Sequence, residues 1–288
     1  TVVYITGMVI AIASIALVYV GLSHGHIEVL NLLELQRVGA MVWIGRPLLV
    51  VRSFTAVALL STSTLQLVLK GTLSHFVVVQ DPWYKTMLAA NEVTWLVAIV
   101  NDIAMAWTQE YTMYYATLNS LLVWLIVVTL SFVAPIDHSL TIAQECSMAQ
   151  VDFQVVCASG TLSIGYLSRV VTMVAIVFGC NAVCFAIARI LAPHPAPSKI
   201  NSIFIYAGAR YLFVSTTWIV DDVYYMDRVS AMLNGILTVR FKRTMYGMDV
   251  KLWRALRVDL PSPDVGGWDD RRAIAVQYGL PVIIGDDI

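Results

Sequence analysis

The amino-acid sequence predicts an all-α membrane helical bundle of about five transmembrane helices, followed by a small soluble α+β tail. Composition is the first reason, since 59% of the 288 residues are hydrophobic and only 13% are charged, about half the charged share of a soluble domain. Apolar runs of about 20 residues recur up to Val220, long enough to cross a hydrocarbon core of about 30 Å. The third reason is that nine of the 18 basic residues gather near the C-terminus: Arg228, Arg240, Lys242, Arg243, Lys251, Arg254, Arg257, Arg271 and Arg272.

Two crossings are predicted in the N-terminal part. Val2–Leu22 has no charged residue and is too long an apolar block for a typical signal peptide, so we interpret it as the first span. Ser23–Arg37 mixes spaced apolar residues with polar ones, a pattern typical of a short helix lying at the membrane interface. Pro47 suits the first position of a helix, and Leu48–Leu69 is the predicted second span, roughly 33 Å long.

Three further spans follow in the middle of the chain. The third, about Thr86–Trp107, is the most polar, the fourth covers Tyr111–Ala134 and the fifth covers Thr161–Leu191. Lys70–Lys85 and Pro135–Gly160 are predicted to be loops. The second of these loops has acidic residues and no Lys or Arg, which favours a location outside the cytosol.

The stretch Ser202–Val220 leaves both five and six spans open. It is apolar but contains Arg210, so it is either a sixth span or a helix lying in the membrane plane. Lys and Arg gather on the cytosolic side of membrane proteins, and a sixth crossing would place the basic tail opposite Arg189 and Lys199. The charge distribution therefore favours five spans, an outside N-terminus and an inside tail.

We predict a transmembrane domain over residues 1–234 and a cytosolic tail over 235–288. In the tail, apolar and polar residues alternate over 237–242 and again over 246–252, which indicates a β-hairpin. A two-stranded hairpin is marginal by itself and needs something to pack on. Asp269 is a suitable cap for a short helix that would end near Tyr278.

Charged side chains inside the predicted spans need partners, because an unpaired ion in hydrocarbon is costly. The five-span topology places Arg52 and Asp102 in the inner half of the bundle, and Glu92 and Arg169 in the outer half. We therefore predict two ion pairs matched by depth, Arg52 with Asp102 and Glu92 with Arg169. These pairs would make the third helix the hub of the bundle.

Further polar residues extend this set of candidates. Asn91 and Asp102 are 11 residues apart, about 20° from eclipsed on a helix, so they share a stripe predicted to face the bundle interior. Asn101 is a candidate beside that stripe. The stripe either locks helix packing or lines a substrate or ion pathway. Arg37 and Arg46 are predicted to anchor the inner side and orient the protein.

Other motifs indicate less specific chemistry. Cys146 and Cys157 lie in the same predicted outside loop, where they would either form a disulfide or remain as two free thiols. Asp221, Asp222 and Asp227 form a carboxylate cluster that could hold Mg²⁺, but one such cluster is a weak signal, a solvated interfacial turn is the favoured interpretation, and no metal site is assigned. No cofactor is predicted, and the residues favour a protein that is not an enzyme.

Two stretches carry a resemblance: QRVGAMVWIGRPLLVVRSFTAVALLSTSTL (36–65) and SAMLNGILTVR with MYGMDVKLWR (within 230–254). They resemble the large, uncharacterised group of multi-pass membrane proteins of oomycetes of the Phytophthora type. The resemblance implies a multi-span bundle with a soluble tail, often as the C-terminal part of a longer chain. It implies no activity and no catalytic residue.

Three functions are consistent with the sequence. The first is a receptor-like or scaffold membrane module, with the lipid bilayer as its surroundings and anionic lipid headgroups or a cytosolic protein as partners of the tail. The second is a transporter or channel that uses the polar third helix. The third is a membrane-embedded transferase built on the Asp221–Asp227 cluster. A nucleic-acid partner is not predicted.

Overall fold

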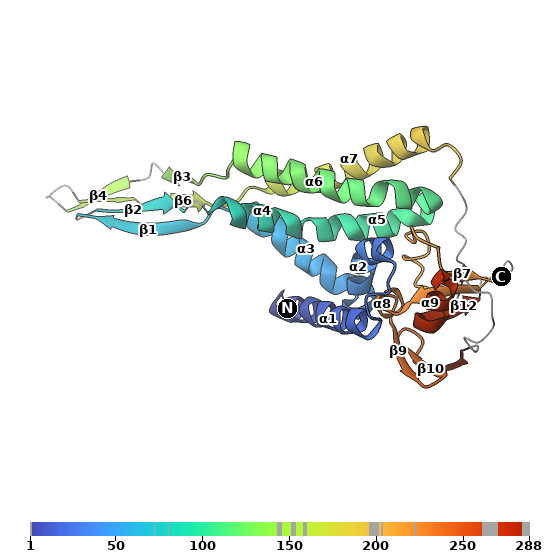
Figure 1. The fold of residues 1–288 in the computed structure, drawn as a ribbon. Helices are drawn as coiled ribbons and strands as arrows, with labels where there is room; N and C mark the ends of the chain where they lie inside the picture. Colours follow the sequence, from blue (N-terminus) through green and yellow to red (C-terminus); the bar gives the residue numbers. More distant parts are fainter. Residues whose placement is uncertain are drawn as a thin grey trace.

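The computed structural model of the chain describes residues 2–71, 73–79, 81–142, 146–150, 154–157, 160–195, 202, 204–221, 223–260 and 270–283. A helical bundle forms its body, β-hairpins project from one end, and a small sheet-containing region lies at the other end (Figure 1). The predicted helical fold with a small sheet-containing region is therefore confirmed. The number of membrane crossings stays a prediction.

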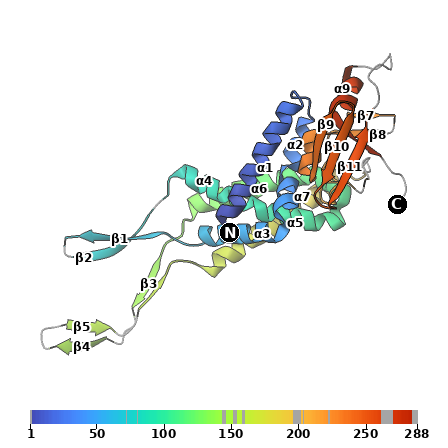
Figure 2. The same cartoon turned by 90° about the horizontal axis from the view of Figure 1, so that it is seen from below.

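Several stretches are long and apolar enough to cross a membrane. Three qualify directly: α1 (Val2–Leu22), the run Trp83–Val133, and α7 (Leu167–Leu191). A fourth candidate is the pair α2 (Val29–Ile44) and α3 (Arg46–Leu60), which bend by 110° between them. Gly45 forms the bend with a φ of +94°, a conformation that glycine adopts without a steric penalty. Viewed from below, α1 runs obliquely to the long axis of the bundle (Figure 2).

The run Trp83–Val133 folds back on itself. It contains α4 (Trp83–Glu92), α5 (Thr94–Thr108), a 3₁₀ turn (Gln109–Tyr111) and α6 (Thr112–Val133). Trp124 Nε1 of α6 donates to the Met87 carbonyl of α4 at 3.2 Å, and Asn119 Nδ2 of α6 donates to Asn101 Oδ1 of α5 at 2.9 Å. Because later residues of α6 meet earlier residues of α4–α5, the two arms are antiparallel.

The predicted second span, Leu48–Leu69, is wrong in its last third. Helix α3 ends at Leu60, and Leu65–Lys70 forms strand β1. Four consecutive hydroxyl residues, 61–64, separate them, and such side chains compete with helical hydrogen bonding. Ser63 donates its backbone N–H to the Ile164 carbonyl at 2.7 Å, which ties this segment to the start of α7.

Both predicted outer loops carry strands. β1 pairs with β2 (Leu73–Val78), so a strand occupies part of the stretch 70–85 that was predicted to be a loop. In the second loop and the residues just after it, β3 (Ser139–Ile142) pairs with β6 (Gly160–Ser163), and β4 (Cys146–Gln150) pairs with β5 (Gln154–Cys157). The fifth span is therefore shorter than predicted and begins at Leu167. The predicted interfacial helix 23–37 is likewise replaced by α2, which begins at Val29 and packs inside the protein.

The C-terminal region contains two three-stranded sheets and two short helices. One sheet has the order β12 (Gly279–Ile283), β8 (Val223–Asp227), β7 (Ile219–Val220), and the other has the order β11 (Arg254–Asp259), β10 (Thr244–Asp249), β9 (Ile236–Phe241). The two alternating runs of the sequence thus pair as β9 and β10. Helix α8 (Arg228–Leu233) lies between the sheets in sequence, and α9 (Asp270–Tyr278) precedes β12. Residues 204–212 form turns and residues 213–218 have no regular secondary structure, so neither a sixth span nor an in-plane helix is present in this described segment.

Buried polar contacts join this region to the first helices. Glu28, between α1 and α2, is almost fully buried and accepts hydrogen bonds from Tyr224 OH at 2.5 Å, Ser215 Oγ at 2.9 Å and Thr217 N at 3.1 Å. Trp43 Nε1 of α2 donates to the Met232 carbonyl of α8 at 3.0 Å. The carboxylate therefore needs no cation, because protein donors satisfy it.

The buried carboxyl of Asp227 makes stability depend on pH. Burial raises the pKa of Asp227 from its ordinary value of 3.8 to about 6, although Ser230 N donates to the carboxylate at 3.0 Å. Between these values the folded chain binds more protons than the unfolded chain, so the free energy of unfolding falls as pH rises through about 6. Relative to Asp227→Asn, which does not titrate, we expect the wild type to lose about 1 kcal/mol between pH 5 and pH 7 in chemical unfolding. Parallel pH profiles for the two chains would contradict this expectation.

Candidate functional site

A largely buried ion pair joins α3 to α4. Arg52 Nε and Nη2 donate to the two carboxylate oxygens of Glu92 at 2.6 and 2.7 Å, a bidentate arrangement, and the Arg52 side chain is only 11% exposed. Arg52 Nη1 also donates to Thr6 Oγ1 of α1 at 3.2 Å. The prediction that Arg52 pairs with Asp102 is therefore wrong. Arg52 connects three helices, α1, α3 and α4.

A second ion pair lies at the bend between α2 and α3. Arg46 Nε donates to Asp102 Oδ2 of α5 at 2.6 Å, with the arginine half exposed and the carboxylate buried. Arg169, the predicted partner of Glu92, instead donates through Nη2 to the Leu130 carbonyl of α6 at 3.0 Å, so that predicted pair is also wrong. The two observed pairs follow antiparallel packing, because the later arginine of α3 meets the earlier acid of α4–α5.

Trp95 lies between two arginines. The guanidinium carbon of Arg37 is 4.4 Å from the centre of the Trp95 ring, and that of Arg52 is 5.7 Å from it. Arg37 Nη2 also donates to Thr94 Oγ1 at 2.7 Å, while Arg37 Nη1 is buried without a hydrogen-bond partner among the described residues. A cation over an indole face is attracted by the ring quadrupole, so Trp95 holds both guanidinium groups in place.

Three buried asparagines meet in the centre of the bundle, one each from α5, α6 and α7. Asn101 Oδ1 accepts from Asn119 Nδ2 at 2.9 Å and from Asn181 Nδ2 at 2.6 Å. Asn101 Nδ2 donates to the Ala116 carbonyl at 3.4 Å. This asparagine triad joins three helices through one acceptor oxygen. Sequence reasoning named Asn101 but missed Asn119 and Asn181, although each is a lone amide in an apolar helix.

A pocket of about 140 Å³ opens beside the triad, between α2, α5 and α6. Residues 208–212, which lead toward the C-terminal sheets, complete its wall through Gly208 and Leu212. Polar lining residues are Glu34, Gln36, Arg37, Asn101, Asp102, Thr112, Thr117 and Ser120. Apolar lining residues include Leu33, Val38, Met41 and Met105. The pocket therefore combines both signs of charge with an apolar surface.

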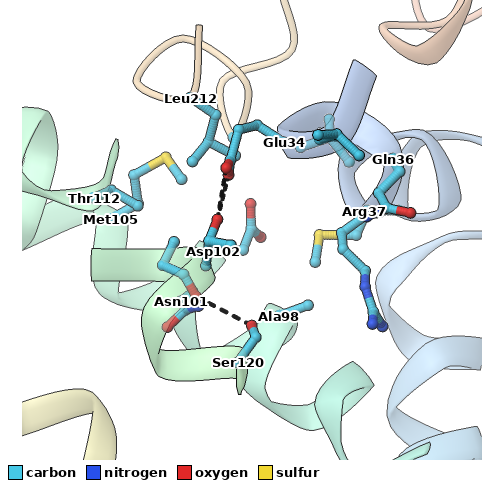
Figure 3. A pocket seen from close by; sticks show the side chains of 16 residues that line it. Glu34, Gln36, Arg37, Ala98, Asn101, Asp102, Met105, Thr112, Ser120 and Leu212 are labelled. Atoms are coloured by element: carbon cyan, nitrogen blue, oxygen red, sulfur yellow. Dashed lines mark hydrogen bonds between the residues drawn. The ribbon is translucent and has the colours of Figure 1, made fainter. Parts of the chain in front are cut away.

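Two charged residues of α2 extend in opposite directions along this pocket (Figure 3). The Glu34 carboxylate accepts from Thr117 Oγ1 of α6 at 2.6 Å, which leaves other lone pairs of the carboxylate free for a ligand. The Arg37 guanidinium is held by Thr94 and Trp95 and keeps a buried N–H group without a partner in the described part of the chain. Both groups are thus oriented by protein contacts before any ligand binds.

The remaining predicted residues lie elsewhere. Asn91 is exposed on α4, so the prediction that it faces the bundle interior is wrong; α4 ends at Glu92, and the stripe does not continue through the break at Val93. Asp227 is fully buried and caps α8, Asp221 is exposed, and Asp222 lies outside the described residues. Among the residues that the structure describes, no three His, Cys, Asp or Glu side chains are placed to hold a metal.

The pairing of strands β4 and β5 determines how Cys146 and Cys157 lie relative to each other. In the antiparallel pair β4–β5, Cys146 lies directly opposite Cys157. Directly opposite Cα atoms on antiparallel strands are about 4.5 to 5.5 Å apart, within the range that a disulfide spans. The side chains of both cysteines lie outside the described part of the structure, so the disulfide stays a prediction.

The sequence matches no family model and no curated protein, and no solved structure matches the chain. The resemblance of residues 36–65 and 230–254 to oomycete membrane proteins therefore stays a prediction.

Proposed function

We propose that the chain is an integral membrane protein with five crossings that acts as a receptor-like module. In this topology α1, α3, α4–α5, α6 and α7 cross the bilayer in alternating directions. The hairpins β1–β2 and β3–β6 leave the same end of the bundle, and the C-terminal sheets lie at the other end (Figure 1). Three basic residues, Lys70, Lys85 and Arg169, lie at the hairpin end in the described part of the chain, whereas the basic tail lies at the end that would be cytosolic, in agreement with the positive-inside rule.

The position of the pocket is the observation that supports a receptor-like role. Its walls come both from bundle helices and from residues 208–212, so a bound ligand would touch the bundle and the segment that leads to the C-terminal sheets. Binding there would shift the equilibrium between arrangements of these two parts, which is the physical basis of a receptor. The ion pairs Arg52–Glu92 and Arg46–Asp102 hold the surrounding helices together without requiring a permeating ion.

The ligand class follows from the lining. Glu34 favours an ammonium group, Arg37 favours a carboxylate, and Met41, Met105 and Leu212 favour an apolar body between them. We propose a small zwitterion with an apolar side chain, for which leucine is a suitable probe. A molecule with only one of the two charges would leave Glu34 or Arg37 desolvated without an oppositely charged partner.

Cysteine labelling tests the pocket and its sidedness in one experiment. Ser120→Cys, in the pocket wall, is reconstituted in vesicles and treated with a membrane-impermeant maleimide from either side. We expect labelling from the tail side only, slowed by leucine but not by 4-methylpentanoate or isopentylamine, which each lack one charge. The wild-type chain reports the background from its own cysteines, and Ser131→Cys, near the other end of α6, serves as the matched control. Labelling that leucine does not slow would contradict the zwitterion pocket.

A transporter is the second candidate, favoured by Asn101. This residue lines the pocket and also belongs to the asparagine triad, so a polar route leads from the pocket into the centre of the bundle. A transporter exposes its binding site alternately to both sides, so Ser120→Cys would then be labelled from both sides of the membrane. Labelling from the tail side alone supports the receptor-like module.

A further inference from the structure

The sheet β9–β10–β11 has two unlike faces. Its register places Arg240, Met245 and Val258 on one face and Val239, Tyr246 and Arg257 on the other. Met245 and Thr238 are buried, so the first face packs against the protein. The second face is exposed, with Val239 63% and Phe241 64% accessible to solvent. Apolar and aromatic side chains cover this exposed face and the adjoining β10–β11 turn: Val239, Phe241, Tyr246, Met248, Leu252 and Trp253.

Basic residues surround this apolar face. Exposed basic side chains stand on the β9–β10 turn, at Lys242 and Arg243, and on β11 within this face, at Arg257. Of the two acidic residues in the described segment 236–260, Asp249 is fully buried and only Asp259 is exposed. The face therefore combines aromatic residues with a net positive charge, the composition of protein surfaces that bind anionic membranes.

Direct contacts fix the sheet at the end of α1. Tyr19 OH accepts from Thr238 N of β9 at 2.9 Å and donates to the Thr238 carbonyl at 3.1 Å. Arg228 Nη2 donates to the same carbonyl at 2.9 Å, and its guanidinium carbon is 5.2 Å from the centre of the Tyr19 ring. Tyr19 lies in the last turn of α1, which ends at Leu22. If α1 crosses the membrane, the sheet is held at the level where α1 leaves the hydrocarbon core.

We infer that the exposed face of β9–β10–β11 binds the anionic surface of the cytosolic leaflet. The aromatic side chains, Trp253 above all, would lie among the headgroups, and Lys242, Arg243 and Arg257 would contact lipid phosphates and carboxylates. This inference rests on the proposed membrane location of the bundle but not on the zwitterion pocket. It adds a lipid-binding surface to the tail and names its residues.

Charge complementarity selects the bilayer over a second copy of the chain. Two such faces would bring six basic groups together, since each carries Lys242, Arg243 and Arg257, and like charges disfavour that contact. The cytosolic leaflet carries a negative surface potential that attracts basic groups within a Debye length. The same leaflet also accepts the apolar and aromatic side chains, so one surface satisfies both parts of the face.

Tryptophan quenching by brominated lipids tests the inference. The full chain is placed in nanodiscs of zwitterionic lipid with or without phosphatidylserine, each containing lipids brominated near the headgroup. Comparing wild type with Trp253→Phe isolates the quenching of Trp253, whose 79% exposure makes this substitution mild for the fold. We expect Trp253 to be quenched, and its quenching to increase at least about twofold when phosphatidylserine is present.

Charge reversal supplies the matched controls. The triple variant Lys242→Glu, Arg243→Glu, Arg257→Glu should abolish the phosphatidylserine effect, whereas Arg272→Glu, an exposed charge on α9, should retain it. Trp253 that is unquenched in both lipid mixtures, in a chain that has entered the nanodiscs, would overturn this inference and leave the pocket untouched. A chain that does not enter nanodiscs would overturn the membrane module and this inference together.

Discussion

Replacing Arg52 with alanine is expected to lower the free energy of unfolding by about 3–5 kcal/mol, because Glu92 would lose its bidentate partner inside the bundle. Glu92→Ala should cost a similar amount, since it leaves the largely buried guanidinium unpaired. The measurement is SDS-titrated unfolding in mixed micelles. Arg52→Lys keeps the charge but not the planar fork, so it should fall between alanine and wild type.

Two further chains show whether the pair acts as a unit. The double variant Arg52→Met, Glu92→Leu removes both charges, and we expect it to unfold within about 1 kcal/mol of wild type. Lys85→Ala removes an exposed ion pair between α4 and Asp81, which precedes that helix, and should change the free energy of unfolding by at most about 0.5 kcal/mol. An Arg52→Ala chain as stable as Lys85→Ala would show that the guanidinium is solvated and that the pair is not a structural link.

The second large effect is expected at the asparagine triad. Asn101→Ala removes the oxygen that accepts from Asn119 and Asn181, leaving two buried donors without that acceptor, which should cost about 2–4 kcal/mol in the same unfolding assay. The matched control is Asn91→Ala, because Asn91 is exposed, and its effect should stay within about 0.5 kcal/mol.

A double-mutant cycle separates the triad from simple packing. Asn119→Leu should cost less in an Asn101→Leu background than in the wild-type chain, because its acceptor has already been removed. Strictly additive effects would mean that the three amides stabilise the bundle independently. That outcome would also weaken the transporter alternative, which depends on a connected polar route.

Long apolar runs could be predicted closely from the sequence. Helix α6 covers Thr112–Val133, against a prediction of Tyr111–Ala134, because no polar residue that breaks a helix interrupts that run. The alternating runs of the tail likewise pair as β9 and β10, since a period of two residues specifies a strand. In both places local pattern and tertiary structure agree.

The partners of the charged residues could not be predicted in the same way. The sequence indicates approximate depth along each helix, and the depth of Arg52 was derived from a straight span over Leu48–Leu69. The bend at Gly45 and the end of α3 at Leu60 shift that helix, so Arg52 reaches Glu92 and Arg46 reaches Asp102. Predicting these partners requires the rotation of each helix about its axis, which depends on how all the helices pack together.

The pocket could not be predicted from the sequence for a related reason. Glu34 and Arg37 lie in a stretch that the residue pattern indicates to be an interfacial helix, whereas α2 continues to Ile44 and enters the protein. The pocket also needs Gly208 and Leu212, which are about 170 residues further along the chain and lie in turns. Contacts between such distant segments leave no periodic signal in a single sequence.

The short length of α3 has a consequence for the surrounding lipid. Its 15 residues span about 22 Å, whereas an average hydrocarbon core is about 30 Å thick. The bend at Gly45 and the hydroxyl residues 61–64 prevent the helix from extending at either end. If α3 crosses the bilayer as proposed, the mismatch is relieved by local thinning around it, at a cost of fractions of a kcal/mol per Å. Membranes of short acyl chains and low sterol content should therefore hold this protein with the least distortion.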